Sequence, residues 1–154
     1  MVEAEVTFNL FLSRSQLTDN SKRLISNVLL HSALKIESRA KQKCPVDTGF
    51  LRASIHSRLI AWNHAQVGSS MAKYAAAVEF GTKPHRPPFA PIKRWAEHKG
   101  IPEAAYPILL KIQREGTPAQ PFLRPALYEE IDNVTKLLIK AQREAIKQSS
   151  RPTP

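Results

Sequence analysis

The sequence predicts an α+β fold, in which a small antiparallel sheet packs against two long helices and a Pro/Gly-rich insert carries short helices. Residues 4–12 alternate apolar and polar side chains, as a half-buried strand does. Residues 22–43 and the segment after Pro125 repeat apolar residues near the 3.6-residue period of an amphipathic helix. Residues 81–121, between these helices, hold most of the twelve prolines and three of the five glycines.

The first half of the chain is expected to form a strand, a helix and a hairpin. Oxygen-bearing side chains at 18–21 can cap a helix over 22–43, which must end at Cys44 because Pro45 disfavours helical geometry in the residue before it. Residues 54–60 and 64–70 are expected to pair around Trp62-Asn63. The strand is expected to face the core with Val6, Phe8, Leu10 and Leu12, and the helix with Leu24, Ile25, Val28, Leu29, Ala33, Leu34, Ile36 and Ala40.

The second half is expected to be helical. Two pieces, 92–99 and 103–115, lie within the insert, with Pro107 in the first turn of the second. The final helix has acidic residues near its start and basic residues near its end, which suits the helix dipole. Its apolar stripe is Leu127, Ile131, Val134, Leu137, Leu138, Ala141 and Ala145. We therefore expect one domain over 1–148 and a flexible C-terminal tail over 149–154.

Composition narrows the class of protein. The formal net charge is +10, from 23 Lys and Arg against 13 Asp and Glu, spread over several segments. This charge fits either an anionic partner or solvated helix faces. The one cysteine excludes an intrachain disulfide, and no window has the roughly 20 apolar residues of a membrane span. Glu3 and Glu5 stand where a signal peptide has basic residues, so we expect a cytoplasmic protein with no membrane partner.

Three segments contain residues that are typical of helix ends, tight turns and helix starts. CPVDTGFLRASI (44–55) reads as a helix stop, a tight corner around Gly49 and a restart fixed to the core by Leu51 and Ile55. YAAAVEFGT (74–82) places small residues between aromatics, with Gly81 suited to closing a helical turn. PAQPFLRPAL (118–127) leads into the final helix, and its Arg124 is either a surface charge or a partner for an acidic group.

Catalytic and cofactor motifs are missing from the sequence. Asp47 and Glu79 have no second acid, base or ligand at useful spacing, and a salt bridge from Glu79 to an Arg such as Arg52 is the better expectation. His85 fits an exposed loop better than a metal or anion site. There is no phosphate-binding glycine loop, nucleophile elbow or zinc spacing. We expect no enzyme activity, no cofactor and no metal.

In their order and spacing, the three segments resemble those of the head–tail joining, tail-completion or minor tail protein Z family of long-tailed phages and prophages. The resemblance covers roughly residues 22–145. It implies a structural virion protein of the neck with no active site. The signature positions, which we interpret as structural or interfacial, are Pro45, Asp47, Thr48, Gly49, Leu51, Arg52, Tyr74, Glu79, Phe80, Gly81, Thr82, Pro121, Phe122, Arg124 and Pro125.

The resemblance further implies a homo-oligomeric ring, with a hexamer favoured and a dodecamer possible. Its neighbours would be a head-side connector or adaptor and a tail terminator or tail tube, with packaged DNA passing through the lumen without specific binding. The protein would reside in the virion neck or tail, and in the host cytoplasm during assembly. A protein that binds nucleic acid without sequence specificity is the alternative, supported by the net charge.

We expect the main partner-facing surface over residues 82–120, because aromatic and arginine side chains often carry interface energy. A long connection of this kind is usually functional or disordered. The alternative is that its helices only cover the sheet. The expected interface residues are Lys83, Arg86, Phe89, Lys93, Arg94, Trp95 and Tyr106, with Lys111 among the nearby cations.

Overall fold

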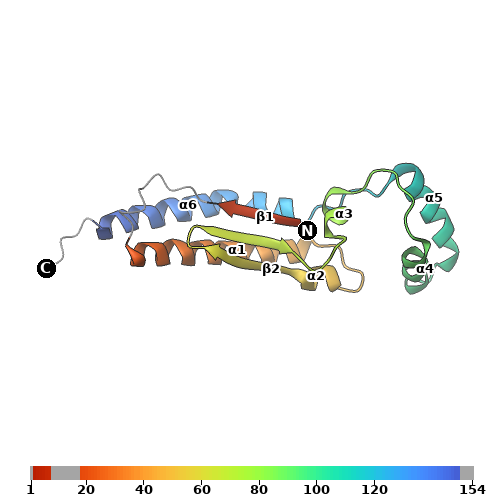
Figure 1. Cartoon of the computed structure of the whole chain (residues 1–154), viewed down its shortest axis with the longest axis horizontal. Helices are drawn as coiled ribbons and strands as arrows, with labels where there is room; N and C mark the ends of the chain where they lie inside the picture. Colours follow the sequence, from red (N-terminus) through yellow and green to blue (C-terminus); the bar gives the residue numbers. More distant parts are fainter. Residues whose placement is uncertain (1, 8–17, 150–154) are drawn as a thin grey trace. The chain divides into compact units, whose positions relative to one another are not determined.

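The computed structural model describes residues 2–7 and 18–149 (Figure 1). The chain divides into two compact units: unit 1 is Met1–Ala75 with Pro121–Pro154, and unit 2 is Ala76–Gln120. The sequence predicted one domain with an insert, whereas the insert forms a compact unit of its own. The elements in order are β1 (Val2–Thr7), α1 (Asp19–Lys43), α2 (Phe50–Ser54), β2 (Ile55–Ala61), β3 (His64–Ser69), α3 (Ala75–Phe80), α4 (Phe89–His98), η2 (Pro102–Ala104), α5 (Ala105–Glu115) and α6 (Leu123–Ser149).

The sheet of unit 1 is antiparallel, with strand order β1-β3-β2. The pairing of β1 runs from Val2 opposite Ser69 to Thr7 opposite His64. β2 pairs with the other edge of β3 and has a register shift between Leu59 and Ala61. This confirms the expected hairpin, and β1 accounts for residues 4–7 of the expected first strand. Residues 8–12 of that strand lie outside the described residues.

Helix α1 packs on β2 and β3. The side chain of Thr18 caps it by accepting a hydrogen bond from the amide of Ser21 at 3.2 Å. Its buried face includes Ile25, Leu29 and Ile36. Leu34 was wrongly expected on this face, since it is 50% exposed. The 100° step per residue turns it well away from Leu29 and Ile36.

Helix α6 runs antiparallel beside α1 (Figure 1). Ser21 Oγ of α1 donates to the carbonyl of Ala145 near one end of the pair, and Lys43 contacts Glu129 near the other. The buried face of α6 includes Val134, Leu138, Ala141 and Ala145. Two members of the expected stripe, Ile131 and Leu137, are instead exposed, because they flank the narrower face that contacts α1 and the sheet.

The corner after α1 forms as predicted. Cys44 is extended, and Gly49 has a φ of 81°, which favours glycine. Thr48 Oγ1 accepts a hydrogen bond from the amide of Phe50 at 3.5 Å. Leu51 and Ile55 are buried and fix the restarted chain to the core.

Unit 2 contains the two predicted helical pieces, with shifted ends. α4 begins three residues earlier than expected, at Phe89, and ends at His98. The second piece is η2 followed by α5, which has Pro107 in its first turn. The sequence pattern thus located both helices of the insert.

Candidate assembly surfaces

The corner segment and the start of the second signature segment come together in unit 1. Burial raises the pKa of the Tyr74 hydroxyl, the nearby Cys44 and Asp47 raise it further, and a hydrogen bond with the backbone of Leu51 opposes the shift. These effects place the hydroxyl beside the corner. The ring of Tyr74 is nevertheless 46% exposed. Tyr74 therefore links the corner to the outer surface.

The third signature segment lies at the same end of unit 1. Phe122 and Leu123 are buried, and Pro125 occupies the first turn of α6. One turn later Glu129 contacts Lys43, the last residue of α1 before the corner, at 2.7 Å. Unit 2 leaves unit 1 after Ala75 and returns to it at Pro121. The first and third signature segments therefore lie at one end of unit 1, and the second and third contain the two points at which the chain passes between the units.

Ion pairs hold this end together. Arg39 donates to Glu130, whose side chain is 4% exposed, and its guanidinium also contacts Glu129 at 2.9 Å. A hydrogen bond from Lys43 is the main cause that lowers the pKa of Glu129, and a hydrogen bond and the charge of Arg39 add to it. Two of the three carboxylates over 129–132 are thus paired within unit 1. The third, Asp132, is exposed and has no ion-pair partner among the described residues.

The second signature segment continues into unit 2. Glu79 is fully buried and takes part in a polar or charged interaction, and its expected salt bridge to Arg52 stays a prediction. Gly81 has a φ of 71°, as expected for a residue that closes a helical turn. A Cβ atom there would lie 2.6 Å from the Thr117 carbonyl oxygen, so a glycine is needed for space as well as for conformation.

A pair of threonines closes the base of unit 2, and we call Thr82 and Thr117 the clasp. The Thr82 amide donates to the Thr117 carbonyl at 3.0 Å, and the Thr117 amide donates to Thr82 Oγ1 at 3.0 Å. The amide of Gln120 donates to the carbonyl of Val78 at 2.8 Å. The outgoing and returning chains are therefore joined at two levels. The sequence analysis missed the clasp; the signal was a Gly-Thr pair at each end of the insert.

The interface residues expected from the sequence all lie on the surface of unit 2. Tyr106 is 61% exposed, and Trp95 and Phe89 are also exposed. Lys93 makes a long ion pair with Glu97, at 3.9 Å, within α4. The other expected interface residues, all exposed, are Lys83, Arg86 and Arg94. Their exposure permits contact with a partner, and the interface itself stays a prediction.

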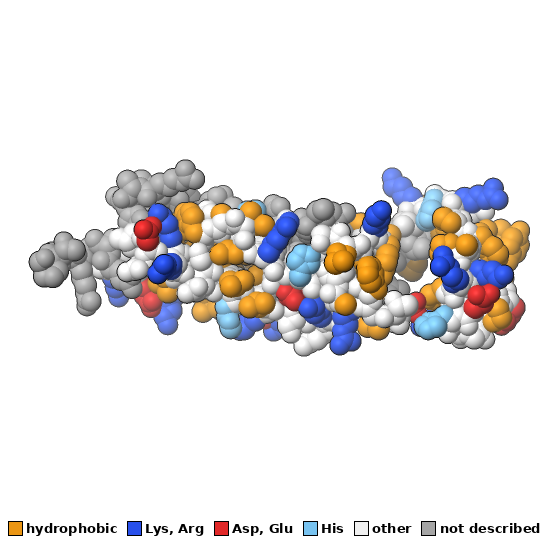
Figure 2. All heavy atoms as spheres, turned by 60° about the horizontal axis from the view of Figure 1, so that its bottom comes forward, with side chains coloured by type: hydrophobic (Ala, Val, Ile, Leu, Met, Phe, Trp, Pro, Cys, Tyr) orange, Lys and Arg blue, Asp and Glu red, His pale blue; other side chains and the backbone are white. Residues whose placement is uncertain are grey.

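Unit 1 has an apolar surface that sequence analysis did not identify. We call Tyr128, Ile131, Ile139 and Ile146 the α6 stripe, and all four are exposed, Tyr128 by 68%. Their spacing places them along one side of the helix, beside the buried face. The separations of 3, 8 and 7 residues, close to whole helical turns, were visible in the sequence, but Ile131 was assigned to the core. Figure 2 shows one face of the molecule, with hydrophobic side chains in scattered groups between Lys and Arg.

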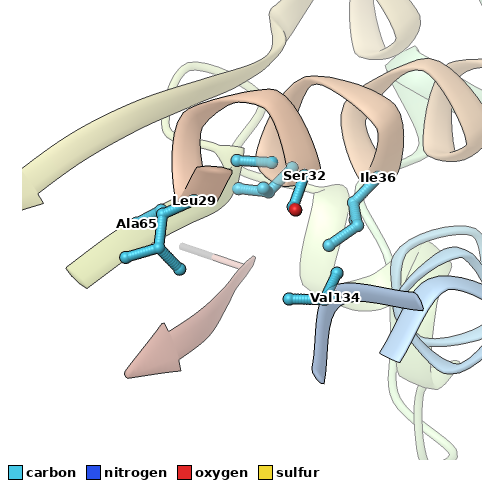
Figure 3. A pocket seen from close by; sticks show the side chains of 7 residues that line it. Leu29, Ser32, Ile36, Ala65 and Val134 are labelled. Carbon is cyan, nitrogen blue, oxygen red and sulfur yellow. The ribbon is translucent and has the colours of Figure 1, made fainter. Parts of the chain in front are cut away.

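The cavity in Figure 3 lies within the core of unit 1 and measures about 10 Å³, roughly the space of one water molecule. Leu29, Ser32 and Ile36 of α1 surround it with Ala65 of β3 and Val134 of α6. The hydroxyl of Ser32 donates a hydrogen bond to the carbonyl oxygen of Val28 at 2.8 Å. This cavity is a small packing defect, too small for an organic substrate.

Over residues 2–7 and 18–149, no group of three or more His, Cys, Asp or Glu side chains is placed to hold a metal ion. None of the helices in the described part of the chain is long and apolar enough to cross a membrane.

A scan against models of protein families found no match, and neither did searches of curated proteins and of solved structures. The likeness to phage neck proteins therefore rests on the three signature segments.

Proposed function

We propose that this protein is a structural component of a tailed-phage neck. It forms a homo-oligomeric ring, hexameric in the favoured form and dodecameric in the alternative, which completes the tail and joins it to the DNA-filled head. Its partners are other copies of itself, a head-side connector or adaptor, and a tail terminator or tail tube. It resides in the virion and, during assembly, in the host cytoplasm. No catalytic step or cofactor is part of the proposal.

One observation supports this proposal: the first signature segment, the start of the second and the end of the third, far apart in sequence, lie together at one end of unit 1. Tyr74 lies beside the corner, and Lys43 before the corner contacts Glu129 after the third segment. Within these segments, Gly49 adopts the left-handed conformation of a turn, and Leu51 and Phe122 pack in the core. Signature residues with such structural roles specify a fold, which here is a small α+β unit with an insert. That supports membership of a structural family.

The distribution of exposed apolar side chains supports a ring. A closed cyclic ring needs heterologous contacts, in which one patch of each copy meets a different patch of the next. Unit 1 has the α6 stripe, and unit 2 exposes Phe89, Trp95 and Tyr106. Two separate apolar surfaces on one chain meet this requirement.

Nucleic-acid binding without sequence preference is the second candidate. The formal net charge is +10, and in unit 2 exposed Lys and Arg side chains neighbour exposed aromatic ones. Spread cations neutralise phosphates without reading bases, so such binding falls steeply with added salt. Tight binding of one preferred sequence at physiological salt would count against the neck proposal.

Particle assembly tests the proposal. In the phage or prophage that encodes the chain, deletion of its gene is expected to give filled heads and separate tails, which negative-stain images distinguish from whole virions. Added purified protein is expected to join the two in a lysate. Whole, infective particles in the deletion strain would refute a neck role. Purified protein that forms no ring under any assembly condition would refute the ring.

A further inference from the structure

We propose that one side of α6 binds the phosphate backbone of duplex DNA. The surface is a row of four cations, which we call the α6 basic row: Lys136, Lys140, Arg143 and Lys147. Its ligand is the sugar–phosphate backbone of any sequence. The inference gives the second candidate function a defined surface. It rests on the proposed neck role only for its biological setting, in which packaged DNA passes through the ring.

The four side chains of the α6 basic row lie along one line of the helix. Their separations of 4, 3 and 4 residues are those of neighbours on one helix face, and at 1.5 Å per residue the row is about 16 Å long. All four side chains are exposed. The opposite side of α6 is buried in unit 1 through Val134, Leu138, Ala141 and Ala145. The cations are thus presented on a helix that is fixed from behind.

The protein itself does not neutralise the α6 basic row. Among the residues that the structure describes, none of its four cations has an ion-pair partner. Near the start of the same helix, by contrast, Glu129 contacts both Arg39 and Lys43 of α1. Residues 133–147 hold the four cations of the row and one carboxylate, Glu144. Positive charge without a partner is therefore concentrated on this part of α6.

Helix α1 adds a fifth cation beside the row. Glu129 lies about two turns before Lys136 on the same line of α6, and it contacts Arg39 of α1 at 2.9 Å. Because the two helices are antiparallel, Lys35, one turn before Arg39, lies beside the start of the row. Lys35 is exposed and has no ion-pair partner in the described part of the chain. The exposed carboxylate of Asp132, one turn before Lys136, limits the cationic surface at this end.

Duplex DNA fits this surface better than a membrane does. Each DNA strand carries a phosphate every roughly 3.4 Å along the duplex axis, so the length of the row faces about five phosphates of one strand. Evenly spaced point charges neutralise such a repeating polymer without reading its bases. A helix that binds a membrane surface buries the apolar side opposite its cations in lipid. In α6 that side is already packed against α1 and the sheet.

A quadruple variant tests the surface, and it replaces the four cations of the row by glutamine: Lys136→Gln, Lys140→Gln, Arg143→Gln and Lys147→Gln. Glutamine has nearly the helix propensity of lysine and arginine, so the fold should be kept, and circular dichroism and thermal unfolding verify this. The matched control removes the same charge from exposed positions of unit 2, through Lys83→Gln, Arg86→Gln, Lys93→Gln and Arg94→Gln. Fluorescence anisotropy of a labelled duplex measures binding by the full chain over a range of salt concentrations.

The unaltered chain is expected to bind the duplex with an affinity that falls steeply as salt rises from about 50 to about 200 mM. Each phosphate contact adds about 0.9 to the slope of log affinity against log salt. Loss of the row should therefore lower this slope by about 3–4 and weaken binding at least about tenfold at the lower salt. The control is expected to keep most of both, and a change of duplex sequence should matter little.

Several results would overturn the proposal. Equal losses in the two variants would show that binding follows net charge, and a larger loss in the control would place the DNA contact on unit 2. An unaltered chain that does not bind the duplex at low salt would exclude the contact. Tighter binding of polyglutamate, or of vesicles containing phosphatidylserine, through the row would make its partner an acidic protein or a membrane.

Failure of the neck role is measured separately. Whole, infective particles in the deletion strain would refute that role, and a loss of DNA binding in the row variant would still uphold the surface. Particle defects in the deletion strain, together with unchanged DNA binding in the row variant, would do the reverse.

Discussion

Thr82 and Thr117, 35 residues apart, bond to each other through both main chain and side chain. Their hydroxyl oxygens lie 2.9 Å apart, and each amide donates to the other residue at 3.0 Å. Because Thr82 Oγ1 accepts from the Thr117 amide, its loss would leave a backbone donor without its partner.

Thr82→Val is therefore expected to loosen unit 2 while leaving unit 1 intact. Valine keeps the shape of threonine but cannot accept the hydrogen bond. The free energy required to open unit 2 is therefore expected to fall by about 1–3 kcal/mol. Hydrogen exchange measures this as faster exchange across 82–120. Thr135→Val is the matched control, because Thr135 lies exposed on α6 and bonds only the carbonyl of Ile131. Equal exchange in the two variants would contradict a closing role for the clasp.

The glycines give a graded series. Gly100→Ala is expected to lower the free energy of unfolding by about 1–2 kcal/mol, because alanine is strained at a φ of 74°. No steric clash adds to this, since the space around the added Cβ is open. Gly116→Ala adds a clash with the Thr82 carbonyl and is expected to disrupt unit 2 far more. Limited proteolysis of the two variants measures the difference. Similar cleavage rates would show that the chains at the clasp separate readily.

The corner offers a comparison in unit 1. Gly49→Val is expected to lower the free energy of unfolding by about 1–3 kcal/mol, because valine is strained at a φ of 81°. A steric clash does not contribute, since no atom lies within 4 Å of an added Cβ. Lys147→Ala, at an exposed position on α6, is expected to change stability by about 0.5 kcal/mol or less. Thermal unfolding compares them, and equal melting temperatures would refute the structural role of the corner.

Stability is expected to fall in acid. Hydrogen bonds from Lys43 and Arg39 lower the pKa of Glu129. For Glu37 burial raises the pKa, but hydrogen bonds from Lys41 and Ser57 outweigh it and the net shift is downward. A carboxylate whose folded pKa is lowered adds stability above its ordinary value of 4.5, and that stability is lost as pH falls through the folded pKa. Denaturant unfolding from about pH 6 to about pH 3 measures this.

The matched variant for this prediction is Glu37→Gln with Glu129→Gln. It is expected to be less stable than the unaltered chain near neutral pH and to show a flatter dependence below the ordinary glutamate pKa. Parallel curves for the two proteins would assign the acid sensitivity to other groups.

Local patterns predicted the elements of this fold well. The ends of α1 follow from its Thr18 cap and from Pro45, which act within a few residues. The buried face of each helix was predicted less accurately, since Leu34 and Ile131 were expected in the core but are exposed. The packing partner decides which part of a broad apolar stripe is covered, and the sequence pattern does not identify that partner. Contacts such as Arg39 with Glu130 join residues 91 apart and leave no periodic signal. The α6 stripe was missed for a different reason: its spacing is helical, but Ile131 was assigned to the buried face.

The last prediction concerns residues 82–120 during assembly. In an isolated subunit, exchange across α4 and α5 is expected to be fast, because the helices bury only Ala96 and Ala105 and rely on the clasp. In the assembled ring their exposed apolar side chains are covered, and exchange should slow across both helices. Residues near the clasp should change less, since they are already hydrogen-bonded. Slow exchange across the whole segment in a verified monomer, unchanged on assembly, would show that unit 2 is stable by itself and needs no partner.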